Sequence, residues 1–305
     1  MSATARSSSS GSPELFRLGL IGAGRMGSTH ARALASSREV AITCVVDPSD
    51  DAAAQVDAAR ATLESLPAVD GFLIAVPTRL HVPVATALAE HGLPILCEKP
   101  CGLTIDETRA IAALGVRVQV AYWRRFVPAL RELRERIAAG RLGELVLVSC
   151  AQLDETPPPA AFRDPASSGG IVVDMGVHEL DQLRWLTGRE ILAVHGVAGA
   201  VGFDDPVEGD PELVQLSVEL EGGVAGSITL ARRYAPGETC RVEAIGLDGA
   251  EAVDFVAPPG GDETIAAALR AQAEDFARGG GDGTSIDDAV AALEAAIRAK
   301  QALGL

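Results

Sequence analysis

The chain has 305 residues, 48% of them hydrophobic, which is enough for one large core or two of ordinary size and excludes a disordered protein. Its formal net charge of −16 at pH 7 disfavours nucleic acid and anionic membranes as partners, and no apolar run approaches the roughly 20 residues that span a bilayer. Five scattered cysteines are typical of reduced thiols in the cytoplasm, and they lack the spacing of a metal site. Residues 1–14, rich in small side chains, are predicted to be a disordered tail.

From residue 15 to residue 121, apolar runs of strand length alternate with helical segments. This rhythm is typical of right-handed βαβ units around a parallel sheet, so the fold class is α/β and this part is expected to be a Rossmann dinucleotide-binding domain. The expected strands are 16–21, 40–46, 71–76, 94–97 and 116–121. The expected helices are 28–36, 52–60, 82–90 and 106–114.

After residue 121 the pattern changes to that of an α+β domain with a mostly antiparallel sheet, covering residues 122–305. The expected strands are 145–151, 191–201, 213–220, 224–231, 240–247 and 251–256. The expected helices are 128–139, 169–186, 264–277 and 286–303, and residues 152–168 are expected to form an irregular, proline-rich loop. One face of such a sheet needs cover, so we expect a homodimer or homotetramer.

A glycine loop, GAGRMG at residues 22–27, follows the first strand and opens the first helix. Gly22 permits a tight turn, Gly24 lets the backbone approach a pyrophosphate, and Gly27 lets the helix pack on the strand. Asp47 ends the second strand, where a carboxylate accepts ribose hydroxyl bonds and repels a 2′-phosphate, which favours NAD over NADP. A glycine-rich turn of another α/β protein is the alternative. The loop residues predicted to bind the cofactor are Gly22, Gly24, Arg25, Met26 and Gly27.

Two further segments follow strands at their carboxyl ends, where open α/β sheets bind ligands. Residues 77–81 (PTRLH) fit either a ligand-binding loop or an ordinary loop with Thr78 near a helix cap. Glu98 and Lys99 precede Pro100, and Lys99 is one of two lysines against 24 arginines. This scarcity indicates a need for a compact, titratable amine that shares in proton transfer, and the alternative is a surface ion pair between Glu98 and Lys99.

Asp174 and His178 are spaced i, i+4, which places both on one face of the expected helix. A histidine beside a carboxylate titrates in a range suited to a general base near neutral pH. A purely structural Asp–His bond is the alternative. The residues predicted to be structural, without such partners, are His30, His91, His195 and, as a local helix charge, Asp181.

Four motifs in this order resemble the glucose–fructose oxidoreductase / inositol dehydrogenase family. They are residues 22–27, 77–81, 98–100 and 169–181. The resemblance extends from about Phe16 to the C-terminal helix. The WRRF segment at residues 123–126 is similar to the segment that inositol dehydrogenases carry after the last Rossmann strand, and the helix around His178 is similar to their catalytic helix.

The resemblance implies hydride transfer between NAD and a ring carbon of a cyclitol or sugar. His178 would take the hydroxyl proton, Asp174 would bind the substrate and tune His178, and Lys99 would bridge substrate and cofactor before a cis bond to Pro100. Beyond the glycine loop and Asp47, the implied cofactor contacts are Val76, Pro77, Thr78, His81, Glu98, Lys99 and Arg124. The implied substrate contacts are Lys99, Trp123, Gln152, Asp174, His178 and Tyr234.

Three departures from the family lie around the substrate and not around the cofactor. Gln152 stands where inositol dehydrogenases tend to carry a histidine, Trp123 replaces a smaller residue, and residues 154–168 are unusually rich in proline. We therefore expect an NAD-dependent cyclitol or sugar dehydrogenase whose substrate need not be myo-inositol. The alternatives are an NAD-using, redox-neutral glycoside hydrolase and a dinucleotide-binding regulator without catalysis, and the intact Lys99, Asp174 and His178 argue against the regulator.

Overall fold

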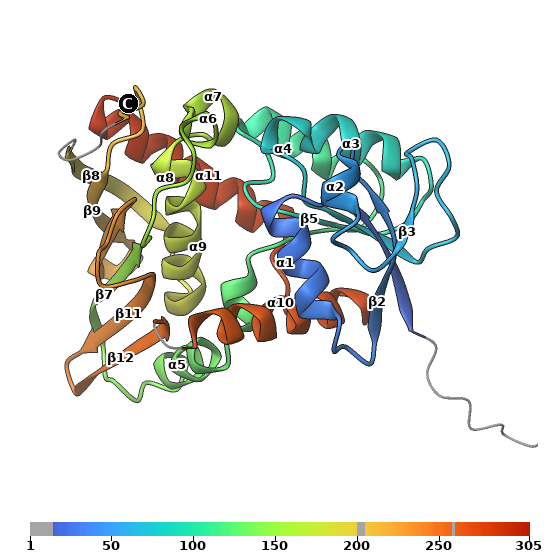
Figure 1. Cartoon of the computed structure of the whole chain (residues 1–305). Helices are drawn as coiled ribbons and strands as arrows, with labels where there is room; N and C mark the ends of the chain where they lie inside the picture. Colours follow the sequence, from blue (N-terminus) through green and yellow to red (C-terminus); the bar gives the residue numbers. More distant parts are fainter. Residues whose placement is uncertain (1–14, 200–204, 258–259) are drawn as a thin grey trace, which may run out of the picture.

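The computed structural model of the protein describes residues 15–199, 205–257 and 260–305. The tail predicted at residues 1–14 and the last two positions of the strand predicted at 191–201 lie outside these residues. Within them the chain forms two six-stranded sheets that lie side by side, each with its own helices (Figure 1). No helix in this described part is long and apolar enough to cross a membrane.

The Rossmann sheet, formed by the N-terminal part, has the strand order β3-β2-β1-β4-β5-β6 with parallel pairing throughout. This strand order is typical of dinucleotide-binding domains, so the predicted fold class is confirmed. Its strands are β1 (Phe16–Ile21), β2 (Val40–Val46), β3 (Ala59–Arg60), β4 (Gly71–Ile74), β5 (Ile95–Cys97) and β6 (Val118–Val120). Its helices are α1 (Arg25–Leu34), α2 (Asp50–Ala53), η1 (Thr78–Leu80), α3 (His81–Ala89) and α4 (Ile105–Ala112).

The helix predicted at residues 52–60 is wrong. Only one helical turn, α2, forms there, and the chain then turns back so that β3 pairs with Cys44 and Val45 of β2. The alanine-rich composition of the segment favours a helix, but pairing at the edge of the sheet decides the conformation of its second half.

The C-terminal sheet has the order β12-β11-β7-β10-β9-β8, in which only the β7–β10 pairing is parallel. The prediction of a mostly antiparallel sheet is therefore confirmed. Its strands are β7 (Leu145–Leu153), β8 (Ile191–Gly199), β9 (Leu213–Leu220), β10 (Ala225–Ala231), β11 (Thr239–Gly246) and β12 (Gly249–Val256). The remaining helices are η2 (Trp123–Phe126), α5 (Pro128–Ala138), α6 (Ala160–Arg163), α7 (Pro165–Ser168), α8 (Ile171–Asp174), α9 (Gly176–Thr187), η3 (Glu221–Gly223), α10 (Gly261–Ala277) and α11 (Ile286–Leu303).

Helices α9 and α11 cover one face of the C-terminal sheet, and none of the described helices covers the other face (Figure 1). In β9 the side chains alternate as this layering requires: Val214 and Leu216 are buried, whereas Leu213 and Ser217 are exposed. Helix α10 leaves this sheet and packs against α1 of the Rossmann sheet, and α11 contacts α4. The two C-terminal helices thereby hold the two sheets in a fixed relation.

A buried ion pair strengthens this junction. The Arg125 guanidinium of η2 donates two hydrogen bonds to Asp181 of α9, at 3.0 and 2.5 Å, and a third at 3.2 Å to Asp288 of α11. Asp181, predicted to be a local helix charge, is instead a buried partner of Arg125. A carboxylate is tolerated in such a place only when it is paired.

Candidate active site

The glycine loop lies at the carboxyl end of β1, and a Cβ atom would have a different effect at each of its three glycines. Gly22 has a φ of +95°, and a Cβ there would lie 2.6 Å from the carbonyl oxygen of Ala75. A Cβ on Gly27 would lie 2.0 Å from the carbonyl oxygen of Gly22. A Cβ on Gly24 would meet no atom within 4 Å. Gly22 and Gly27 are therefore needed for the turn and its packing, whereas Gly24 leaves room for a ligand.

The amino end of α1 fits the pyrophosphate of a dinucleotide. Gly24 at the N-cap offers no side-chain cap, and the first turn carries no acidic residue, so the first N–H groups of the helix are left for an anion. Asp47 lies beside the loop, where its carboxylate accepts hydrogen bonds from the N–H groups of Ala23 and Ser49, at 2.7 and 2.8 Å. Since a carboxylate has about four acceptor sites, Asp47 retains capacity for ribose hydroxyls.

The loop after β4 is fixed by His81. Its side chain is buried, and Nε2 lies 3.0 Å from the carbonyl oxygen of Val76. Burial is the main cause that lowers the pKa of His81 below its ordinary value, so the ring is neutral at pH 7. His81 thus holds the turn in place, while Val76 and Thr78 are half-buried and Pro77 is exposed at the same sheet edge.

Glu98 and Lys99 point in different directions. The buried Glu98 carboxylate lies 2.7 Å from His30 Nε2 of α1, so His30, predicted to lack such a partner, has one. Burial raises the pKa of Glu98, but hydrogen bonds and charge from His30 and Lys99 outweigh it and hold the pKa below its ordinary value. A surface Glu98–Lys99 ion pair, the alternative left by the sequence, is therefore wrong. The Lys99–Pro100 bond is cis, as expected.

Lys99 reaches from the Rossmann sheet to the C-terminal part of the chain. Its Nζ donates to the carbonyl oxygen of Asp174 at 2.7 Å and to Asp174 Oδ1 at 3.1 Å. Arg232 donates to the other carboxylate oxygen, Oδ2, at 2.8 Å. Burial raises the pKa of Asp174, yet the charges of Lys99 and Arg232 outweigh it and keep the pKa below its ordinary value. Asp174 is consequently ionised and anchored between two cations.

Arg232 and Asp210 complete this network, and sequence reasoning missed both. Arg232 follows β10 and is fully buried, and its second nitrogen donates to Asp210 Oδ1 at 3.0 Å. The same oxygen accepts the N–H of Ile171, at 2.6 Å, at the start of α8. The available signal was an arginine directly after a buried strand. Because the chain has 24 arginines, Arg232 does not stand out from the others in the sequence.

His178 lies in α9, where it is 5% exposed and packs edge-on against the rings of Tyr122 and Trp123. Within the described residues, its Nδ1 has no hydrogen-bond partner. Burial, together with the positive charges of Lys99 and Arg124, lowers the pKa of His178 well below its ordinary value. The imidazole is therefore neutral at pH 7 and can accept a proton.

The expected relation between Asp174 and His178 needs a correction. The helix predicted over 169–186 is divided at Met175 into α8 and α9, and each Asp174 oxygen is bonded to a cation. The pKa of His178 is consequently lowered by burial and by cations and is not set by a neighbouring carboxylate. Lys99 is the group that connects the two residues electrostatically.

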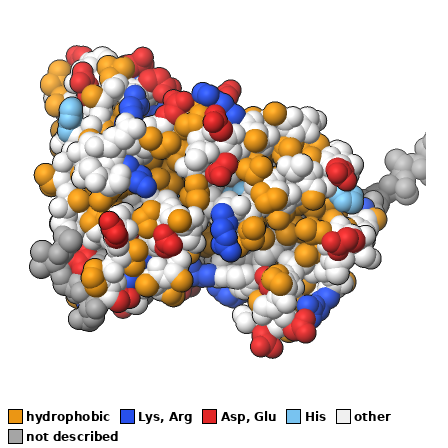
Figure 2. Space-filling model, turned by 90° about the horizontal axis from the view of Figure 1, so that it is seen from above, with side chains coloured by type: hydrophobic (Ala, Val, Ile, Leu, Met, Phe, Trp, Pro, Cys, Tyr) orange, Lys and Arg blue, Asp and Glu red, His pale blue; other side chains and the backbone are white. Residues whose placement is uncertain are grey.

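The other predicted contacts lie on the C-terminal side. Arg124 is buried in an ion pair with Glu179 and donates to Gln152 Oε1 at 2.7 Å. Trp123 is 8% exposed, and Tyr234 is half-buried in the turn after β10. Figure 2 shows one outer face of the molecule, with acidic side chains scattered over it and basic ones among them near the middle.

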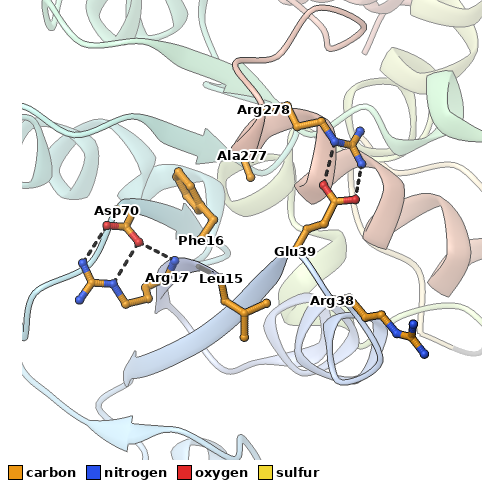
Figure 3. Close-up of a pocket in the computed structure, with 8 residues that line it drawn as sticks. All are labelled: Leu15, Phe16, Arg17, Arg38, Glu39, Asp70, Ala277 and Arg278. Atoms are coloured by element: carbon orange, nitrogen blue, oxygen red, sulfur yellow. Dashed lines mark hydrogen bonds and ion pairs between the residues drawn. The ribbon is translucent and has the colours of Figure 1, made fainter. Parts of the chain in front are cut away.

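A surface pocket of about 400 Å³ lies elsewhere, at the amino end of β1 (Figure 3). Four of its charged lining residues form two ion pairs, Arg17 with Asp70 and Arg278 with Glu39, each at 2.8 Å. The glycine loop and Lys99 lie at the opposite, carboxyl end of the strands. This pocket is therefore not part of the candidate active site.

The contrast between the glycines gives a prediction. In Gly24→Ala, which has a compatible φ of −64°, we expect a melting temperature equal to that of the parent without NAD, but binding of NAD weaker by about tenfold or more because the added methyl occupies the phosphate position. NAD-induced thermal stabilisation measures this. Gly27→Ala is the control that should lose stability even without NAD. An unchanged NAD-induced shift in Gly24→Ala would contradict the assignment.

Comparison with known proteins agrees with this geometry. The pattern of the family described as "Oxidoreductase family, NAD-binding Rossmann fold" matches residues 16–126, and that of the "GFO/IDH/MocA C-terminal domain" matches residues 130–250. The chain is 46% identical to the Rhizopine catabolism protein MocA of Rhizobium meliloti, over 94% of this chain and 95% of that protein. It is 33% identical to the scyllo-inositol 2-dehydrogenase (NAD(+)) of Bacillus subtilis (strain 168), over 76% of this chain and 72% of that protein.

Among solved structures, a putative myo-inositol dehydrogenase from Sinorhizobium meliloti 1021 superimposes with a TM-score of 0.85 and 26% identity, covering 94% of this chain and 97% of its own. A myo-inositol dehydrogenase from Corynebacterium glutamicum ATCC 13032 gives a TM-score of 0.84 and 28% identity, covering 95% and 97%. The chain therefore belongs to the GFO/IDH/MocA family of oxidoreductases and carries its NAD-binding Rossmann domain.

Proposed function

We propose that this protein is an NAD-dependent dehydrogenase that oxidises a ring hydroxyl of a cyclitol or sugar. The observation that carries the proposal is the meeting of Lys99 with Asp174, near His178, at the sheet edge that holds the glycine loop. Relatives named as inositol dehydrogenases support the class of substrate. Lys99, Asp174 and His178 together are suited to deprotonate one ring hydroxyl while its carbon is oxidised.

When bound, NAD supplies the acceptor for the hydride. His178 takes the proton of the reacting hydroxyl on its imidazole, which is neutral beforehand because of burial and nearby cations. The Lys99 ammonium has three N–H groups. Two of them donate to the carbonyl and carboxylate oxygens of Asp174, so one remains for the substrate oxygen. Its charge there stabilises the developing alkoxide. Asp174, bonded on both oxygens, holds Lys99 in place.

We further propose that the enzyme is a homo-oligomer and that it works in the cytoplasm. The open face of the C-terminal sheet, on which Leu213 is 45% exposed, supports a homodimer or homotetramer. Its mass by size-exclusion chromatography tests this, since a 31.4 kDa monomer would contradict it. All five cysteines are free and buried, which supports a reducing compartment such as the cytoplasm.

The roles of His178 and Lys99 are tested by substitution. His178→Ala and Lys99→Ala should each lower the rate of NADH formation by about 100-fold or more, because each removes a group that handles the reacting proton. NADH absorbance is followed with a panel of inositols and aldoses. The matched control is His195→Ala, an exposed histidine of β8, whose rate should equal that of the parent.

Two results of this experiment would count against the proposal. Absence of turnover by the parent enzyme with every polyol, in both directions, would contradict the dehydrogenase function itself. Near-normal rates in both His178→Ala and Lys99→Ala, with active parent enzyme, would contradict the roles assigned to the two residues.

The pKa of His178 sets the expected pH dependence of the oxidation. A base works in its neutral form, and the pKa of His178 lies well below the ordinary 6.5 because of burial, Lys99 and Arg124. We therefore expect kcat/KM to stay level as the pH falls from 7 to 6.5 and to decline only in more acid solution. Lys99→Ala removes one of these cations and should move the decline to higher pH. A decline of the parent enzyme centred at or above pH 7 would contradict the account.

A further inference from the structure

The two lysines of this chain bond to opposite ends of the same short helix, α8. Lys99 Nζ donates at 2.7 Å to the carbonyl oxygen of Asp174, the last residue of α8. Lys300 lies in the last turn of α11, where it is half-buried, and its Nζ donates at 3.2 Å to the carbonyl oxygen of Gly169, just before α8 begins. Within the described residues Lys300 forms no ion pair, so this backbone oxygen is the partner that its ammonium has.

Helix α8 needs such anchors because it cannot keep its position by itself. It has four residues, about one turn, and so short a helix is not stable without tertiary contacts. Gly169 and Gly170, which precede it, have φ values of +85° and +74°, and a Cβ on Gly169 would lie 2.5 Å from Val173 Cβ. Since glycine has the greatest backbone freedom, the entry to α8 is the part that most needs to be held.

Side chains from distant parts of the sequence hold the ends of α8. At the entry, Asp210 accepts the N–H of Ile171 at 2.6 Å, and Lys300 comes from α11, which lies beside α8 (Figure 1). At the exit, the Asp174 carboxylate bonds to Lys99. A displacement of the entry therefore displaces the carboxylate that holds the Lys99 ammonium.

We propose that Lys300 is a positioning residue for the reaction: its bond to Gly169 fixes the entry to α8, and through this helix it fixes Asp174 and the Lys99 ammonium. The inference rests on the proposed dehydrogenase function. One lysine of the chain then serves the substrate, and the other supports the helix that holds the first.

The charges around His178 supply a readout of this role. The titratable groups that face it are Lys99, Arg124 and the Tyr122 phenol, and burial raises the pKa of Tyr122 well above its ordinary value, so that it is neutral. Burial is the main cause that lowers the pKa of His178, and the charges of Lys99 and Arg124 add to it. When Lys99 moves away, the pKa of His178 rises toward the ordinary 6.5, and more of the imidazole is protonated in mildly acid solution.

The test removes the donor of Lys300 and keeps an unbranched side chain. Lys300→Met should lower kcat/KM for the best polyol by about tenfold, because small displacements of catalytic groups are costly, and should move its acid-side decline to higher pH. Stabilisation by NAD against heat should equal that of the parent, since the glycine loop is untouched. A loss of fold stability alone would lower the melting temperature and leave the pH profile in place. If Lys300→Met does not fold, Lys300→Gln replaces it in the same comparisons.

Arg298→Met is the matched control. Arg298 lies in the same helix and also donates to a backbone carbonyl oxygen, that of Ile191 in β8, at 3.0 Å. Its removal takes one charge and one bond of the same kind from α11, but the bond leads to β8 and not to α8. We expect a lower melting temperature with the kcat/KM and the pH profile of the parent.

A double variant tests the route through Lys99. In an enzyme that already carries Lys99→Ala, Lys300→Met should lower kcat/KM no further, because the group that it positions is gone. An independent effect would instead lower kcat/KM by about tenfold again, as effects at uncoupled sites add in free energy.

The outcomes separate this inference from the function on which it rests. Parental kcat/KM and pH profile in Lys300→Met would overturn the role of Lys300 and leave the dehydrogenase function standing. An equal shift in Arg298→Met, or a further loss in the double variant, would overturn that role in the same way. Failure of the parent enzyme to oxidise any polyol would overturn the dehydrogenase function and this inference with it.

Discussion

The buried ion pair between Lys99 and Asp174 is the interaction on which the site depends. Lys99 lies two residues after β5 of the Rossmann sheet, whereas Asp174 ends the short helix α8 of the C-terminal part. The pair therefore forms only when the two parts pack together. A buried charge whose partner is removed costs on the order of 3–5 kcal/mol, which makes each residue a requirement for the position of the other. Arg232 and Asp210 extend the requirement to the end of β10 and the start of α8.

The rest of the chain keeps this junction rigid. Helices α10 and α11 come late in the sequence, yet they pack against α1 and α4 of the Rossmann sheet (Figure 1). Arg125 joins η2 to α9 and α11 through Asp181 and Asp288. Because His178 lies in α9, the packing that positions Asp181 also positions the proposed base. Cofactor loop, lysine and histidine are therefore held by one connected framework.

Local sequence patterns predict those parts of the fold whose conformation is set by residues close together in the chain. The central strands β4 and β5 are apolar runs because both of their faces are buried. The glycine loop can be identified from the spacing of its three glycines between the first strand and the first helix. Lys99 could be singled out because lysine is scarce in this chain. The helix expected at residues 52–60 failed because pairing with β2, a non-local contact, overrides alanine's preference for helix.

The electrostatics of the site could not be predicted in this way. The partners of the buried charges are far apart in sequence: His30 and Glu98 differ by 68 positions, and Arg232 and Asp174 by 58. Spacing alone suggested that Asp174 serves His178, whereas in three dimensions two cations occupy its oxygens.

The most direct test of the central claim is an experimental structure of the enzyme with NAD and a bound substrate of the cyclitol class. The account predicts that one ring hydroxyl lies within hydrogen-bond distance of both the His178 imidazole and Lys99 Nζ, with the hydrogen on its carbon facing the nicotinamide. A substrate bound with all its hydroxyls away from His178 and Lys99 would contradict it.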